Sequence, residues 1–163
     1  MIHDLCAWLG NTAFAYALQT TPWIIPASQT VHILAVAFLF SAIILLAFRI
    51  LGLGGSSQSR RETALRLAPF VWWAVPVLLL TGLLQITAEP ERSLLNPVFW
   101  LKMALLASSL ALFGLYHFYI RQGEALAGRN PVLSRALHST FALLSIALWT
   151  GIIFAGRMIA YAQ

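Results

Sequence analysis

The chain has 163 residues, of which 60% are hydrophobic and only 9% are charged, whereas about a quarter of the residues in soluble domains are charged. A soluble protein of this size would need far more polar surface to cover its core, so the composition predicts an integral membrane protein. The net charge of +5 suggests arginines that anchor helices at an anionic leaflet. It does not suggest a nucleic-acid partner, because the sequence has no motif for binding RNA or DNA.

The first 20 residues are too few and too mixed in polarity to span a membrane. Leu5, Trp8, Leu9 and Tyr16 recur at helical spacing, with polar residues between them. This pattern predicts a short amphipathic helix over residues 1–20 that lies on the outer surface of the membrane.

Four later segments are long and apolar enough to cross a bilayer, which takes about 20 residues in a helix. We predict spans over about residues 23–53, 67–87, 97–120 and 137–161. The sequence shows no internal repeat and no second domain. Residues 1–163 are therefore expected to form a single all-α domain, a four-transmembrane-helix bundle preceded by the interfacial helix.

Local signals predict where some of these spans begin and end. Gly52 predicts the end of the first span, because glycine readily adopts the left-handed conformation that follows a helix C-terminus. Asn96-Pro97 and Asn130-Pro131 predict the starts of the third and fourth spans, because asparagine is a good N-cap and proline suits the first helical position.

The basic residues are unevenly distributed along the chain. Seven lie in or beside the loops that follow the first and third spans: Arg49, Arg60, Arg61, Arg66, Arg121, Arg129 and Arg135. Three lie toward the opposite side: Arg92, Lys102 and Arg157. By the positive-inside rule, this bias predicts that both termini lie outside.

Two of the four histidines lie at matching positions on either side of the second basic loop. His117 precedes Arg121 by four residues and His138 follows Arg135 by three. At about 1.5 Å per residue, the two imidazoles lie at nearly the same depth on helices that a short loop makes antiparallel neighbours. The pair predicts axial ligands of a b-type haem, with Arg121 and Arg135 placed to contact its propionates.

The same two histidines have a simpler interpretation. Histidine is common at membrane interfaces, where its polar tip reaches water, and the small residues near the pair also suit ordinary helix packing. Both interpretations stay open, because the spacing is far less specific than that of a metal motif such as CxxC.

A second group of polar residues lies in the outer half of the predicted bundle. His32 lies about nine residues, or about 13 Å, into the first span, and Lys102 and Arg157 enter the third and fourth spans from the same side. Ionisable groups at such depth are costly and tend to be functional. The sequence has no acidic residue at matching depth, so these cations predict a bound anion or acceptor, either the propionates of an outer haem ligated by His32 or a quinone headgroup.

The outer group also has plain structural alternatives. Lys102 and Arg157 have stems long enough to reach the lipid headgroups. His32 can bond to Gln29 or to a backbone carbonyl. An outer haem would further need a second axial ligand, for which the candidates are His3, Met103 and Met158. The sequence thus predicts one or two b-type haems without deciding the number.

The chain also resembles a known group of proteins. Residues 8–54 resemble the first third of an uncharacterised family of short four-span bacterial inner-membrane proteins, and residues 96–106 and 147–161 resemble its third and fourth spans. The resemblance covers nearly the whole chain. Its most specific elements are Trp23, Pro26, His32, Arg49, the segment 96–102 and Gly156-Arg157.

This family is similar in architecture to four-helix b-type cytochromes and to D-type copper-resistance membrane proteins. That similarity implies a haem or metal role for His32, Lys102 and Arg157. Family members often carry an acidic residue just before the arginine of the first span, whereas Phe48 precedes Arg49 here. The resemblance therefore implies that Arg49 has lost an ion-pair partner.

The leading functional hypothesis is an electron-transfer membrane subunit. It would bind b-type haem, with His117, His138 and His32 as ligands of the iron. It would link the quinone pool to a redox partner. We expect its contacts to be membrane lipids and other membrane or periplasmic redox subunits. A stand-alone enzyme is less favoured, because the sequence has no nucleophile paired with a base.

Two other functions compete with electron transfer. One is a structural or accessory subunit of a larger membrane complex, in which a stripe of small residues packs against a foreign helix. That stripe consists of Ala104, Ala107, Ser108 and Ala111. The other is a metal-ion handling protein, against which the sequence argues, because no span carries an acidic residue or a Met-rich or Cys-rich path.

Overall fold

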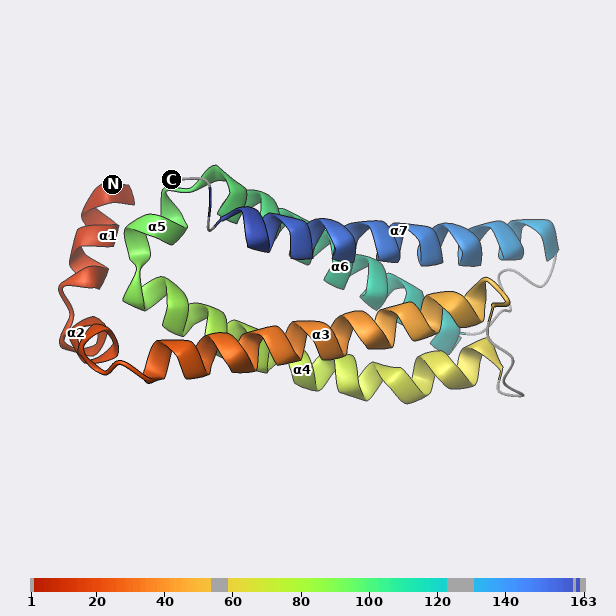
Figure 1. The fold of residues 1–163 in the computed structure, drawn as a ribbon. Coiled ribbons are helices and arrows are strands. Elements are labelled where there is room, and N and C mark those ends of the chain that lie inside the picture. Colours follow the sequence, from red (N-terminus) through yellow and green to blue (C-terminus); the bar gives the residue numbers. More distant parts are fainter. Residues whose placement is uncertain (1, 54–58, 123–130, 160, 162–163) are drawn as a thin grey trace.

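The computed structural model describes residues 2–53, 59–122, 131–159 and 161 of the chain. This part is built from α-helices joined by short turns (Figure 1). The helices are α1 (Ile2–Gly10), α2 (Ala13–Thr20), α3 (Ile24–Ile50), α4 (Arg60–Ala88), α5 (Pro90–Leu94), α6 (Pro97–Gln122) and α7 (Pro131–Met158).

Among the described residues, 4 helices are long and apolar enough to cross a membrane, namely α3, α4, α6 and α7. The predicted all-α class and the predicted number of spans are therefore confirmed. By the length and composition of its helices, the chain is a multi-pass membrane protein.

The four long helices pack as two pairs. α3 lies against α4 and α6 lies against α7, and the pairs are joined mainly through α3 and α7, whereas α4 and α6 touch little. α1 and the C-terminal end of α7 lie toward one end of the bundle (Figure 1), which we call the termini end. The opposite end, toward which residues 53, 59, 122 and 131 lie, is called the loop end. The separation of α4 from α6 leaves room between the pairs.

The buried core lies mainly in the half of the bundle toward the loop end. Leu39, Leu46 and Val71 are among its most completely buried side chains, and Phe113 and Phe141 join it from α6 and α7. Large apolar side chains on the outer faces stay exposed, including Leu34, Leu80, Leu115 and Phe154. Such exposure suits contact with lipid, because the hydrocarbon core of a bilayer offers no hydrogen-bond partners to polar groups.

The C-terminus of α3 confirms the role predicted for Gly52. Gly52 has a φ of 78°, and its N–H donates to the Arg49 carbonyl at 3.3 Å. The N–H of Leu53 donates to the Phe48 carbonyl at 2.9 Å. This pair of bonds is the Schellman motif, which satisfies carbonyls that the helix leaves without partners. The helix consequently ends at Ile50, a few residues before the predicted end of the span.

The start of α4 was predicted too late, because a capping box was overlooked. The Ser59 side chain accepts from the Glu62 N–H at 3.1 Å, and the Ser59 N–H donates to the Glu62 carboxylate at 2.7 Å. This reciprocal arrangement follows the sequence pattern S-x-x-E, which begins the helix at Arg60 instead of near residue 67.

Asparagine and proline begin the third long helix as expected. The Asn96 side chain accepts from the Val98 N–H at 2.9 Å, directly before α6 starts at Pro97. The fourth long helix starts at Pro131 and ends at Met158, so it begins earlier than predicted and ends sooner. Asn130 lies outside the described residues.

The N-terminal segment forms two short helices where a single helix was predicted. The first helix ends at Gly10, and the Thr12 side chain caps α2 by accepting from the Ala15 N–H at 3.1 Å. α5, which was not predicted, packs against α1 beside the end of α4. The location of this layer at a membrane surface stays a prediction.

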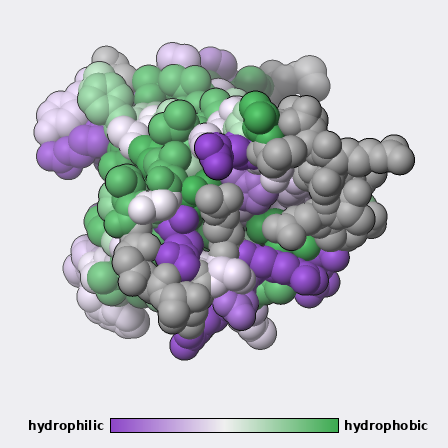
Figure 2. Space-filling model, turned by 90° about the vertical axis from the view of Figure 1, so that its right-hand side faces the viewer, coloured by the Kyte–Doolittle hydropathy of each residue, from purple (hydrophilic) through white to green (hydrophobic). Residues whose placement is uncertain are grey.

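The loop end carries the exposed arginines on which the predicted orientation rests. Arg61, Arg66, Arg121 and Arg135 are exposed, and Figure 2, which looks onto this end, shows hydrophilic side chains among hydrophobic ones. Arg49 is not isolated here, since its charge acts on Glu62 of α4. Arg49 therefore has an interaction within the described structure, and the loss of the acid that the resembled family carries beside it stays a prediction.

The left-handed conformation of Gly52 yields a stability prediction. Gly52→Ala should lower the free energy of unfolding by about 1–2 kcal/mol, because Cβ disfavours this backbone region. Gly114→Ala is the matched control: it lies inside α6 with no atom within 4 Å of an added Cβ, so it should raise stability by about 0.5–1 kcal/mol. Denaturant titration in detergent micelles measures both, and equal effects would contradict the cap.

Candidate functional site

A cavity lies in the half of the bundle toward the termini end, between the diverging α4 and α6. Its volume is about 230 Å³, and α3, α4, α5, α6 and α7 all contribute to its walls. The walls are mainly apolar. Representative lining residues are Leu79, Ile86, Phe99, Leu106, Trp149 and Ile152. Because all of these helices except α5 are predicted spans, most of the cavity lies within the apolar part of the bundle.

His32 lines this cavity and is held by α4. Its Nδ1 lies 2.8 Å from the Thr81 hydroxyl oxygen. Thr81 is buried, and its hydroxyl also bonds to the Val77 carbonyl of its own helix at 2.7 Å. Gln29, an alternative partner predicted for His32, is exposed. His32 is therefore oriented by a residue of the neighbouring helix α4. The sequence around His32 does not indicate this contact.

Lys102 brings a positive charge to the same cavity. Its side chain is partly buried, and Gly156 of α7 lies beside the stem, so that a Cβ added there would come within 3.8 Å of Nζ. No described acidic residue forms an ion pair with Lys102, and no acidic residue lines the cavity. A buried cation is costly unless it is paired, so this ammonium group favours an acceptor in the cavity.

Gln85 is a cavity residue that the sequence analysis missed. Its Nε2 is buried and has no hydrogen-bond partner among the described residues. An unpaired buried amide costs about 1–3 kcal/mol, and such a group calls for an unseen partner such as a water or ligand. The sequence signal that could have identified Gln85 is its position one turn from the end of an apolar span, where a polar amide is uncommon.

The structure separates the two cations that the sequence analysis grouped together. Arg157 is exposed and does not line the cavity. Its guanidinium donates to the Tyr161 hydroxyl at 3.0 Å and lies 5.3 Å from the centre of that ring. Arg157 thus points toward the end of its own helix, while Lys102 points inward.

The two histidines toward the loop end contact aromatic rings. His138 is buried, and its Nδ1 lies 2.6 Å from the Ser134 carbonyl. Tyr116 and Tyr119 of α6 meet its ring edge-on, with centroids 5.7 and 5.8 Å away. His117 instead stacks on Phe113 of its own helix, and its buried Nδ1 has no partner among the described residues.

The remaining predicted ligands are distributed as follows. Arg121 and Arg135 are exposed near the loop end. Met103 lines the same cavity as His32, whereas His3 and Met158 do not. The described residues contain no group of three or more His, Cys, Asp or Glu side chains that could hold a metal ion.

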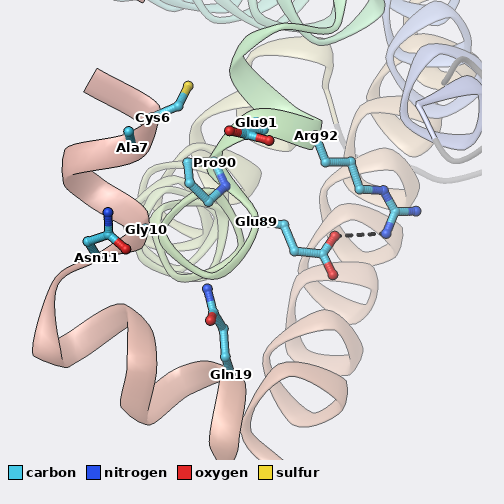
Figure 3. Close-up of a pocket in the computed structure, with 9 residues that line it drawn as sticks. All are labelled: Cys6, Ala7, Gly10, Asn11, Gln19, Glu89, Pro90, Glu91 and Arg92. Atoms are coloured by element: carbon cyan, nitrogen blue, oxygen red, sulfur yellow. Dashed lines mark hydrogen bonds and ion pairs between the residues drawn. The ribbon is translucent and has the colours of Figure 1, made fainter. Parts of the chain in front are cut away.

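A second, more open pocket of about 650 Å³ lies at the termini end, between α1, α2 and α5 (Figure 3). The free thiol of Cys6 is buried at its edge. Glu89 and Arg92 form an ion pair of 2.8 Å there, and Gln19 donates to a backbone carbonyl of α4. Since Ser93 of α5 lines the membrane cavity, α5 forms a wall that both spaces share.

No family model, no curated protein and no solved structure matches this chain. The fold and the cavity define its class as an all-α, multi-pass membrane protein with a polar group of side chains inside the bundle. The resemblance to short four-span bacterial membrane proteins stays a prediction.

The contact between His32 and Thr81 gives a second stability prediction. Thr81→Val should lower the free energy of unfolding by about 1–3 kcal/mol, because it leaves the buried imidazole Nδ1 unsatisfied. Thr87→Val is the control, since that hydroxyl is exposed and bonds only within its own helix, and it should change stability by less than about 0.5 kcal/mol. Unfolding in detergent micelles measures the difference, and equal losses would contradict this role of Thr81.

Proposed function

We propose that this chain is a membrane-embedded electron-transfer subunit that binds a lipid-soluble quinone in the cavity of the termini half. It would exchange reducing equivalents between the quinone pool and a redox partner. The single observation that carries the proposal is the convergence of His32, Lys102 and Gln85 on one apolar cavity. An apolar cavity with a few convergent polar groups is the usual form of a small-molecule site.

The chemistry of the cavity suits a quinone ring. A quinone presents two carbonyl oxygens on a flat apolar ring, and Lys102 and Gln85 supply N–H donors. Gln85 Nε2 has no hydrogen-bond partner among the described residues, and no described acidic residue forms an ion pair with Lys102. The leucine, isoleucine and aromatic walls suit the ring itself. Lys102 and Gln85 would then each gain an acceptor from the ligand.

The size of the cavity also favours a ring with a long tail. At about 230 Å³, the cavity is smaller than the roughly 300–1,000 Å³ typical of sites that enclose a whole ligand. A quinone headgroup would enter it while the isoprenoid tail lies along the exposed apolar faces of the helices. A complete haem would require more space than this cavity has.

The location proposed for this function is the inner membrane of a bacterium, with the termini end outside. The exposed arginines at the loop end support this orientation through the positive-inside rule. The cavity would then lie in the outer leaflet, close to the layer formed by α1, α2 and α5.

Quinone binding is tested by removing the cavity cation. Lys102→Met should weaken the binding of a short-chain benzoquinone about tenfold or more, because a hydrogen bond from a charged group contributes about 1.5–3 kcal/mol. Arg157→Met removes a cation that does not line the cavity and should leave the Kd within about twofold. Calorimetry on protein in lipid nanodiscs measures both. Loss of binding in both variants, or in neither, would contradict the proposed site.

A b-type haem near the loop end is a second candidate, supported by His138. The bond between its Nδ1 and the Ser134 carbonyl leaves Nε2 as the nitrogen for iron, and such a second bond is usual for metal-ligating histidines. His117 and His138 would hold the iron, and Arg121 and Arg135 would contact the propionates. When bound, the haem would supply a one-electron carrier.

The absorption spectrum tests the haem candidate. The protein purified from haem-replete cells should show a Soret band and a pyridine haemochrome, and His138→Ala should abolish both because one axial ligand is lost. His3→Ala is the control, since His3 lies exposed on α1. A wild-type protein without a Soret band would eliminate this candidate and leave the quinone site in place.

An accessory role in a larger complex is also supported by one observation. The small residues of α6 that were expected to meet a foreign helix are all exposed, namely Ala104, Ala107, Ser108 and Ala111. Only 11% of the most apolar stretch of α6 is buried, against 28–33% in the other three spans. This face would accept a helix of the redox partner, because small residues allow close backbone approach.

A further inference from the structure

We infer that the cavity distinguishes the two redox forms of its ligand and prefers the hydroquinone, through a hydrogen bond from the ligand hydroxyl to Nε2 of His32. This inference rests on the proposed function and adds to it the form of the ligand that is bound. The argument depends on which nitrogen of the imidazole carries the proton.

The hydrogen bonds of Thr81 decide the tautomer of His32. The Thr81 hydroxyl has one proton, and that proton is directed to the backbone of its own helix, 2.7 Å from the Val77 carbonyl and 3.3 Å from the Leu78 carbonyl. Its oxygen can then only accept from His32. The contact of 2.8 Å between His32 Nδ1 and Thr81 Oγ1 is therefore a bond that Nδ1–H donates.

The other ring nitrogen is left as an acceptor. In a neutral imidazole with a proton on Nδ1, Nε2 carries a lone pair. A doubly protonated ring would place a second cation beside Lys102 in an apolar cavity, which is costly. His32 thus offers an acceptor to the cavity, and the ring is held in place because Thr81 is buried.

The polar groups of the cavity therefore form a mixed set. His32 Nε2 accepts, Lys102 donates, and the Gln85 amide has an Nε2 that lacks an acceptor among the described residues. A ligand that fits must offer both a donor and acceptors. A hydroquinone does so, because each hydroxyl donates once and also accepts. A quinone carbonyl only accepts, so it would face the lone pair of His32 without a proton between them.

The size of the expected preference follows from that mismatch. Leaving a buried acceptor unsatisfied costs enough to change affinity about tenfold or more. The structure thus makes His32 a specificity-determining residue and Thr81 its positioning residue. Neither role was visible in the sequence, where the two residues lie 49 positions apart.

The test compares both redox forms on the full chain in lipid nanodiscs. Anaerobic calorimetry with decyl-benzoquinone and with its hydroquinone gives two dissociation constants. The wild type should bind the hydroquinone about tenfold more tightly. His32→Phe, which keeps an aromatic ring but removes the acceptor, should weaken hydroquinone binding about tenfold and reduce the preference to less than about threefold.

Thr81→Val separates the tautomer from the imidazole itself. It keeps the ring but removes the acceptor for Nδ1–H, so the proton is free to move to Nε2 and the preference for hydroquinone should shrink to less than about threefold. Thr87→Val, outside the cavity, should retain the full preference. Far-UV circular dichroism that matches the wild type shows that both cavity variants are folded.

Three results would overturn the inference, and the third would also overturn the proposed function. If the wild type binds both redox forms with equal affinity, or if His32→Phe keeps the preference, the acceptor role of His32 is wrong while the quinone site stands. If neither form binds to the wild type, the proposed function fails and this inference fails with it.

Discussion

The structure depends on one constraint, which is that hydrocarbon offers no partner to a polar group. Every polar side chain within a span must therefore be satisfied by another helix, by its own helix or by a bound molecule. Thr81 satisfies Nδ1 of His32 across two helices, and the Ser134 carbonyl satisfies His138 within one. Among the described residues, Gln85 Nε2 has no hydrogen-bond partner and Lys102 has no ion-pair partner, and both side chains line the same cavity. The case for a ligand rests on that difference.

The two halves of the bundle have different roles, one in stabilising the fold and the other in binding a ligand. Toward the loop end, the core is filled by side chains from α3, α4, α6 and α7, and this packing stabilises the four-helix arrangement. Toward the termini end, α4 and α6 diverge and small residues keep space open. Gly82 lies near His32, and Gly156 lies near Lys102. A well-packed half thus holds the helices while the other half keeps room for a ring.

Sequence reasoning succeeded where the cause is local. The Schellman motif at Gly52 and the cap at Asn96 were predictable from residue type, because each depends on bonds within a few positions. The late start predicted for α4 was an error of the same local kind, since the pattern from Ser59 to Glu62 was present in the sequence. The break between α1 and α2 was missed because the apolar spacing continues across it, while Thr12 caps a new helix.

Hydropathy and spacing were sufficient to establish from the sequence alone that this is an all-helical, four-span membrane protein with ionisable groups inside its spans. Only the tertiary structure decided how those groups are used. The rotation of each helix about its axis depends on packing against its neighbours. The sequence of one span does not contain that information. That rotation brings His32 to Thr81, turns Lys102 into the cavity with Gln85, leaves Arg157 outside on Tyr161, and places Glu62 near Arg49.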